Sequence, residues 1–176
     1  MCSSDLMKTL YLLRHAEAEA SSGLADNDHG RLLSARGRIE ARAVGDYMKT
    51  EGFLPDYVIG SDALRTVSTA RQALEGVFGN EKNPVKALYD RKLYLAPLDA
   101  LLMHIQAVPS HVEQLLLVAH NPGLAELAAY LDLEKAFDLE GFAPATLAVY
   151  RTVADDWALM VPDNTNMSTF FTPNVA

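Results

Sequence analysis

The chain has 176 residues, of which 49% are hydrophobic, a composition that fits one compact domain with a sizeable core. Its formal net charge of −8 argues against nucleic acid as the main partner, because affinity for phosphate backbones comes from massed Lys and Arg. The single cysteine, Cys2, excludes an internal disulfide and favours a reducing, cytoplasmic setting.

The first six residues are polar and lack the basic and apolar regions of a signal peptide. We expect residues 1–6 to be a disordered tail and residues 7–176 to form a single domain. No apolar run in the sequence approaches the ~18 residues of a membrane span. A soluble protein without a membrane partner is therefore expected.

A buried strand opens the predicted domain. Residues 10–13 are apolar at consecutive positions, which is typical of a parallel strand covered on both faces. Residues 20–33 are rich in Ser, Gly, Asp and Asn and predict a loop. Ser34 then offers a cap for a helix whose apolar stripe is formed by Ile39, Ala43 and Tyr47.

The order of strand, loop and helix recurs in the next segment. Residues 57–59 predict a short strand, and residues 60–62 predict a turn. The apolar positions expected on the inner face of the following helix are Val67, Ala70, Leu74, Val77 and Phe78.

The second half of the chain continues the alternation. Residues 98–105 predict a helix, and residues 115–118 predict another buried strand. Residues 124–131 predict a further helix, with Pro122 in its first turn.

Two β-prone stretches, residues 146–150 and 157–161, predict an antiparallel pair at the edge of the sheet. Strands and helices that alternate with short connections are typical of layered α/β proteins. We therefore expect an α/β fold: a three-layer α/β/α sandwich whose central sheet is mostly parallel, with an antiparallel edge.

Two histidines and two arginines fall at or just after the ends of the predicted strands. Ligands of open α/β sheets bind beyond the carboxyl ends of the strands. Arg14 and His15 end the first strand, Arg65 follows the second, and His120 ends the strand at 115–118. Guanidinium groups match phosphate oxygens, and a neutral imidazole nitrogen is a nucleophile toward phosphorus. The set predicts phosphoryl transfer.

Three ordered segments carry a family signature: YLLRHAE at 11–17, SDALRT at 61–66 and VAHNPG at 118–123. They resemble the Arg-His, second-arginine and second-histidine motifs of the histidine phosphatase superfamily. The resemblance implies a phosphoglycerate-mutase-like fold, no metal or other cofactor, and His15 as the phosphorylated nucleophile. The residues that it implies for binding the phosphoryl group are Arg14, Arg65 and His120.

The short chain, Ala16 in place of a more usual glycine, and the segment RLLSARG at 31–37 resemble the SixA branch, the phosphohistidine phosphatases. That branch implies a phosphohistidine substrate on a protein. A phosphatase of sugar phosphates or other small phosphorylated substrates is the alternative within the superfamily. A non-catalytic module that binds phosphorylated partners is the alternative outside it, although such a module needs cations and no nucleophile.

A general acid is harder to identify. Larger members of the superfamily place a carboxylate after the second helix, where this chain has Asp90. Arg91 and Lys92 would lower the pKa of Asp90, which suits a surface ion pair better than a proton donor. The alternatives are Glu17 and Asp99.

Further polar residues lie next to the motifs. Glu17, Arg31 and Asn121 are candidates for contacts with the substrate, and a solvated surface position fits Arg31 equally well. Tyr94 is expected in the core or in the pocket wall. His104 lacks neighbouring Cys or carboxylate residues, so a position on a helix surface is expected for it rather than a metal site.

Overall fold

The computed structural model describes residues 7–21, 23, 27–80, 84–135 and 141–176, so the tail expected at 1–6 lies outside the described residues. Six strands form one sheet in the order β3-β2-β4-β1-β5-β6. Neighbours from β3 to β1 are parallel, whereas β5 and β6 are antiparallel to their neighbours. The strands are β1 Lys8–Arg14, β2 Tyr57–Ser61, β3 Lys86–Asp90, β4 Gln114–Ala119, β5 Leu147–Thr152 and β6 Thr165–Phe171. The predicted parallel sheet with an antiparallel edge is confirmed.

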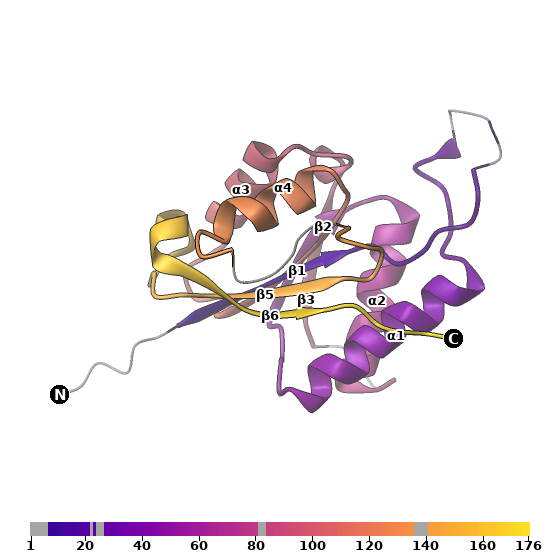
Figure 1. Cartoon of the computed structure of the whole chain (residues 1–176), viewed down its shortest axis with the longest axis horizontal. Helices are drawn as coiled ribbons and strands as arrows, with labels where there is room; N and C mark the ends of the chain where they lie inside the picture. The colour runs from indigo at the N-terminus through magenta and orange to yellow at the C-terminus, as the bar shows by residue number, and fades with distance from the viewer. Residues whose placement is uncertain (1–6, 22, 24–26, 81–83, 136–140) are drawn as a thin grey trace.

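Helices cover both faces of this sheet, as Figure 1 shows. One face carries α1 (Ala35–Thr50) and α2 (Leu64–Phe78). The other carries α3 (Leu98–Gln106) and α4 (Gly123–Leu131). The predicted three-layer α/β/α sandwich is therefore confirmed.

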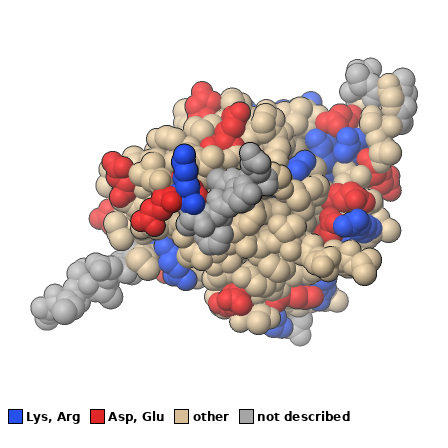
Figure 2. Space-filling model, in the orientation of Figure 1, with Lys and Arg blue, Asp and Glu red and all other residues tan. Residues whose placement is uncertain are grey.

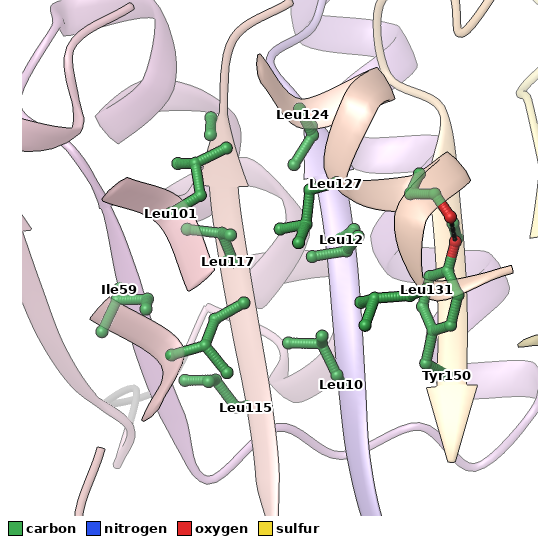
Figure 3. Packing of buried hydrophobic residues seen from close by; sticks show 14 of the residues in the cluster. Leu10, Leu12, Ile59, Leu101, Leu115, Leu117, Leu124, Leu127, Leu131 and Tyr150 are labelled. Carbon is green, nitrogen blue, oxygen red and sulfur yellow. Dashed lines mark hydrogen bonds between the residues drawn. The ribbon is translucent and has the colours of Figure 1, made fainter. Parts of the chain in front are cut away.

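Strand β1 shows why a continuous apolar run was expected to be buried. Leu10 and Leu12 belong to the core cluster that includes residues of α3 and α4, and in Figure 3 Leu12 lies beside Leu127 of α4. Tyr11 joins the core under α1 and α2. Because successive side chains of a strand point to opposite faces, a strand covered on both faces must be apolar at every position.

The α1–α2 contact corrects the predicted helix stripe. Ile39 is 55% exposed, and the buried face of α1 instead includes Ala41 and Val44. Gly45 lies against α2 so closely that a Cβ there would be 2.1 Å from the carbonyl oxygen of Ala73. Small residues let the two helix backbones touch, so this face carries little apolar signal in the sequence.

One further expectation about strands is corrected, and one strand was not predicted. Residues 157–161 were expected as the partner of β5, but Trp157–Leu159 is a short 3-10 helix and the partner is β6. The Trp157 side chain is fully buried, and its Nε1 donates to the carbonyl oxygen of Val112 at 2.8 Å. Strand β3 was not predicted, because its first three residues are exposed at the edge of the sheet and show no apolar run.

The connection between β1 and α1 extends beyond the end of β1, on the side where the parallel strands have their carboxyl ends (Figure 1). On the face shown in Figure 2, acidic and basic side chains of the described residues are interspersed. Among the described residues, no helix is long and apolar enough to cross a membrane.

Candidate active site

The carboxyl ends of the parallel strands bring the four predicted residues to one rim of the sheet. Arg14 ends β1 and His15 follows it, His120 follows β4, and Arg65 lies in the first turn of α2. The amide of His15 donates to the carbonyl oxygen of Ala119 at 3.2 Å, which ties the ends of β1 and β4 together. The ring centroids of His15 and His120 are 5.2 Å apart. Nη2 of Arg65 lies 3.4 Å from Nδ1 of His120.

The hydrogen bonding of His15 fixes which ring nitrogen is free. Its Nδ1 lies 2.9 Å from the carbonyl oxygen of Ala16. Because a carbonyl oxygen only accepts, Nδ1 carries the proton and Nε2 keeps its lone pair. Burial is the main cause that lowers the pKa of His15 to about 4, so the ring is neutral at neutral pH. The arginines whose charges lower this pKa further are Arg65, Arg14 and Arg31.

His120 is held in the opposite tautomer. Its Nδ1 accepts from Arg65, so the proton lies on Nε2, which is 3.4 Å from Oγ1 of Thr66. Burial lowers the pKa of His120 to about 3, and the neighbouring His15 and Arg65 lower it as well. A bound phosphoryl dianion would stabilise the protonated form of this ring, because opposite charges close together favour ionisation.

Arg14 is anchored by a neutral group. Its Nη1 donates to the carbonyl oxygen of Phe142 at 2.7 Å, and Nδ2 of Asn121 donates to the same oxygen at 2.9 Å. Burial lowers the pKa of Arg14. The predicted residue Asn121 therefore lies beside Arg14, with which it shares a backbone acceptor.

Arg65 is anchored by a carboxylate that sequence analysis did not identify, Asp28. Nη1 of Arg65 donates to the backbone carbonyl of Asp28 at 2.6 Å, and Nη2 lies 3.1 Å from Oδ2. Arg31 pairs with Oδ1 of the same residue at 3.1 Å. The hydroxyl of Tyr94 donates to Oδ2, and this bond is the largest cause that lowers the pKa of Asp28. Through these contacts, Asp28 connects Arg31 and Tyr94 with Arg65 at the rim.

Tyr94 lies in the pocket wall, as expected. Its ring meets the ring of His120 edge-on, with centroids 5.4 Å apart. Asp28 lies in a turn-rich loop whose composition predicts turns without predicting partners. The sequence signal that could have identified it is an acid three positions before Arg31, in a loop that leads away from His15.

Positive charge at this rim is supplied by arginines. The Nε atoms of Arg14, Arg31 and Arg65 are buried, and none has a hydrogen-bond partner within the part of the chain that the structure describes. In the same part, no three His, Cys, Asp or Glu side chains are grouped so as to hold a metal ion. Buried N–H groups beside a neutral histidine suit a phosphoryl group, whose oxygens accept hydrogen bonds.

The predicted acids lie in other contacts. Oδ1 of Asp90 accepts from the amide of Lys92 at 2.9 Å, and Oδ2 is 3.4 Å from Nε2 of His104. The carboxylate of Glu17 accepts from Ser34 at 2.7 Å, which supports the start of α1. Oδ1 of Asp99 accepts the amide of Ala100 at 3.0 Å. None of these side-chain contacts involves the four residues at the rim.

Comparison with known proteins agrees with this fold and site. Residues 10–91 match the family model of the histidine phosphatase superfamily (branch 1). An uncharacterized protein of Mycobacterium tuberculosis is 31% identical over 168 residues, which cover 92% of this chain and 99% of that protein.

Two solved structures share the fold over nearly the whole chain. One, from Nakamurella multipartitia, is 27% identical with a TM-score of 0.79, and the match covers 96% of this chain and 98% of that one. Another, from Agrobacterium tumefaciens, is 28% identical with a TM-score of 0.76 and covers 95% and 99%. Both carry a provisional assignment as the phosphohistidine phosphatase SixA.

The sheet, the Arg-His rim and these matches define the class of the protein. The chain belongs to the histidine phosphatase superfamily, in its SixA-type branch. A phosphatase activity on a phosphorylated substrate follows from this membership.

Proposed function

We propose that residues 7–176 form one catalytic domain that hydrolyses phosphohistidine on proteins through a phosphorylated His15, without a metal ion. The observation that carries the proposal is the state of His15. Its ring is neutral, its Nδ1 is occupied by the Ala16 carbonyl, and its Nε2 has no hydrogen-bond partner among the described residues and lies near arginines. A module that only binds phosphorylated partners would need the arginines but not this nucleophile.

In the first step, the lone pair of Nε2 on His15 forms a bond to phosphorus. The bond between phosphorus and the leaving atom breaks, and its electron pair departs with the leaving group. Arg14 and Arg65 neutralise the phosphoryl oxygens as charge redistributes, and His120 donates to one of them. Each such donor typically contributes about 10²–10³-fold to the rate.

In the second step, water attacks the phosphorus bound to His15. The P–N bond breaks and its electron pair returns to Nε2, which releases inorganic phosphate and restores the neutral ring. The arginines act in both steps, since the charge on the phosphoryl oxygens is similar in each.

The chemistry of the leaving group supports phosphohistidine as the substrate. An imidazole leaves as a neutral molecule once its other ring nitrogen is protonated, whereas an alkoxide needs a proton at the bridging oxygen. Asp90, the predicted acid, is engaged with Lys92 and His104. The provisional SixA assignment of the two similar structures supports the same substrate. The lone Cys2 supports the cytoplasmic location that we propose.

The substrate is tested with a phosphohistidine peptide and a sugar monophosphate, each assayed with and without a chelator. We expect kcat/KM to be far higher for the phosphohistidine peptide and unchanged by the chelator. A preference for the sugar phosphate would contradict the phosphohistidine substrate and would assign the phosphatase to a different substrate class. Loss of activity on chelation, restored by one metal, would contradict the metal-independent reaction.

A further inference from the structure

A histidine–carboxylate pair, His29 and Asp62, lies near the rim that carries the four predicted residues. Nε2 of His29 is 2.6 Å from Oδ1 of Asp62, and their side chains are 27% and 35% exposed. Asp62 directly follows β2. The backbone carbonyl of His29 accepts from the amide of Leu64 at 3.1 Å, so the loop is fixed on the first turn of α2. This backbone hydrogen bond fixes the main chain at His29 independently of the contacts of its side chain.

A row of rings links His29 to the nucleophile. The centroid of His29 is 5.0 Å from that of Tyr94, which lies 5.4 Å from His120, and His120 lies 5.2 Å from His15. In an in-line displacement the leaving group departs on the side of phosphorus opposite the attacking nitrogen. His15 lies at one end of this row, and His29, whose side chain is 27% exposed, lies at the other end, where a departing group can reach solvent.

The bond to Asp62 also decides which nitrogen of His29 is available. A carboxylate only accepts, so Nε2 carries a proton and donates to Asp62. Nδ1 has no hydrogen-bond partner among the residues that the structure describes. Imidazole is the side chain that ordinarily exchanges a proton between about pH 5 and 8. The titratable groups near the His29 ring are Asp62, Tyr94 and His120, and the adjacent Asp28 is paired with Arg31 and Arg65.

We propose that His29 is the proton donor to leaving groups that, unlike imidazole, depart with a proton, and that Asp62 is its positioning residue, an inference that rests on the phosphatase reaction proposed above. As Nε2 of His15 attacks phosphorus, the bond to the leaving atom breaks. The electron pair of that bond takes the proton from Nδ1 of protonated His29. His29 becomes neutral and keeps the Nε2 proton on Asp62.

The same group serves the second step in reverse. Neutral Nδ1 of His29 accepts a proton from the water that attacks the phosphorylated His15. The P–N bond breaks, its electron pair returns to Nε2 of His15, and inorganic phosphate leaves. His29 is then protonated again, so the two steps together consume one phosphorylated substrate and one water without a net change in the enzyme.

The chain contains a matched control for this assignment, the pair of His104 and Asp90. Their closest approach, Nε2 to Oδ2, is 3.4 Å, and Nδ1 of His104 is engaged with the carbonyl oxygen of Ala100 at 2.8 Å. The His104–Asp90 pair therefore has the same two residue types as the His29–Asp62 pair, but both ring nitrogens of His104 are occupied. Nothing in its contacts joins it to the rim.

The experiment measures how the rate depends on the leaving group. His29→Gln and His104→Gln are assayed on p-nitrophenyl phosphate, whose phenolate departs without a proton, and on phenyl phosphate, whose phenolate needs one. We expect His29→Gln to lose about 10²-fold in kcat/KM on phenyl phosphate and less than about threefold on p-nitrophenyl phosphate, because acid catalysis matters most for poor leaving groups. His104→Gln should match the wild type on both. The retained p-nitrophenyl phosphate activity also shows that the variant is folded.

Equal losses on both substrates, or no loss on either, would overturn the assignment of His29. Asp62→Asn should lower kcat on phenyl phosphate with little change in KM. An unchanged kcat, or a change in KM alone, would remove Asp62 from the proposal. A wild-type enzyme that forms no phosphorylated His15 would instead refute the phosphatase mechanism itself, so the two failures are distinguishable.

Discussion

The two arginines of the phosphoryl pocket are held in different ways. Arg14 donates to the carbonyl of Phe142, a neutral acceptor that it shares with Asn121. Arg65 is paired with the carboxylate of Asp28 at 3.1 Å. A neutral anchor orients a guanidinium and leaves its charge uncompensated, whereas a carboxylate orients it and offsets part of that charge. We infer that Arg14 supplies most of the field on the phosphoryl group, and that Arg65 has its field moderated by Asp28.

Replacing each arginine separately should have the largest effect and tests the comparison directly. We expect Arg14→Ala to lower kcat/KM on p-nitrophenyl phosphate by about 10²–10³-fold, which is typical of losing one electrostatic donor. Arg65→Ala should cost less, because Nη1 and Nη2 of Arg65 both donate to Asp28 and so leave fewer N–H groups for the phosphoryl oxygens. Steady-state kinetics of both variants checks the order. A larger loss for Arg65→Ala would contradict the difference that we draw between them.

The pH dependence should be the next largest effect. With a pKa of about 4, His15 is deprotonated and reactive at neutral pH, and kcat/KM should fall about tenfold per pH unit below that pKa as the ring gains a proton. Removing a positive charge stabilises the protonated ring and raises its pKa. Since Arg65 lowers this pKa more than Arg14 does, Arg65→Ala should move the acid limb to higher pH by more than Arg14→Ala. Titration of His15 by NMR measures the shift directly, and equal shifts would contradict the greater effect of Arg65 on the pKa of His15.

Asp28→Asn should have a smaller effect, which tests how far Asp28 offsets the charge of Arg65. Removing the carboxylate restores the full charge of Arg65, worth about 1 kcal/mol or about fivefold in affinity for an anion at solvent-screened distances. We therefore expect tungstate to inhibit the variant more tightly in competition with substrate. Asp46→Asn, which breaks the exposed pair with Arg42, is the matched control and should leave inhibition unchanged. Weaker inhibition of Asp28→Asn would show that Asp28 helps to bind the anion by orienting Arg65.

Asp90→Asn should have the smallest effect. Its hydrogen bond to the amide of Lys92 is the largest cause that holds the pKa of Asp90 below its ordinary value, so the group is ionised at neutral pH. We expect kcat/KM on the phosphohistidine peptide to stay within about twofold of the wild type, whereas a true general acid would cost about 10²–10⁴-fold on a substrate with a poor leaving group. A loss of that size on phenyl phosphate would return Asp90 to the role of acid.

The rim could be predicted because it depends on the ends of buried strands. The apolar runs that contain Leu12 and Leu117 are continuous, so their ends, and with them His15 and His120, can be located in the sequence. The parallel arrangement then requires those ends to meet at one edge. The helix at 124–131 was equally clear, because its leucines pack on a sheet covered by α3 and α4.

Other features left weaker signals. The contact of α1 with α2 depends on Gly45 and Gly76, which an apolar pattern does not register. Strand β3 is exposed at the edge of the sheet and lacks a run of buried residues. Asp28 and His29 lie in a turn-rich loop, and their roles depend on distant partners in the sequence. Asp28 is 37 positions from Arg65, and His29 is 33 positions from Asp62. Tertiary contacts of this kind leave no periodic trace in the chain.

The central claim is that Nε2 of His15 carries the phosphoryl group, and trapping the intermediate tests it most directly. The wild type is mixed with a ³²P-labelled phosphohistidine peptide, quenched within milliseconds, and divided between acid and base. We expect a label on His15 that is lost in acid and stable in base, as a phosphoramidate is. The label should be absent from His15→Ala. Turnover without a labelled enzyme, or a label and turnover that persist in His15→Ala, would contradict it.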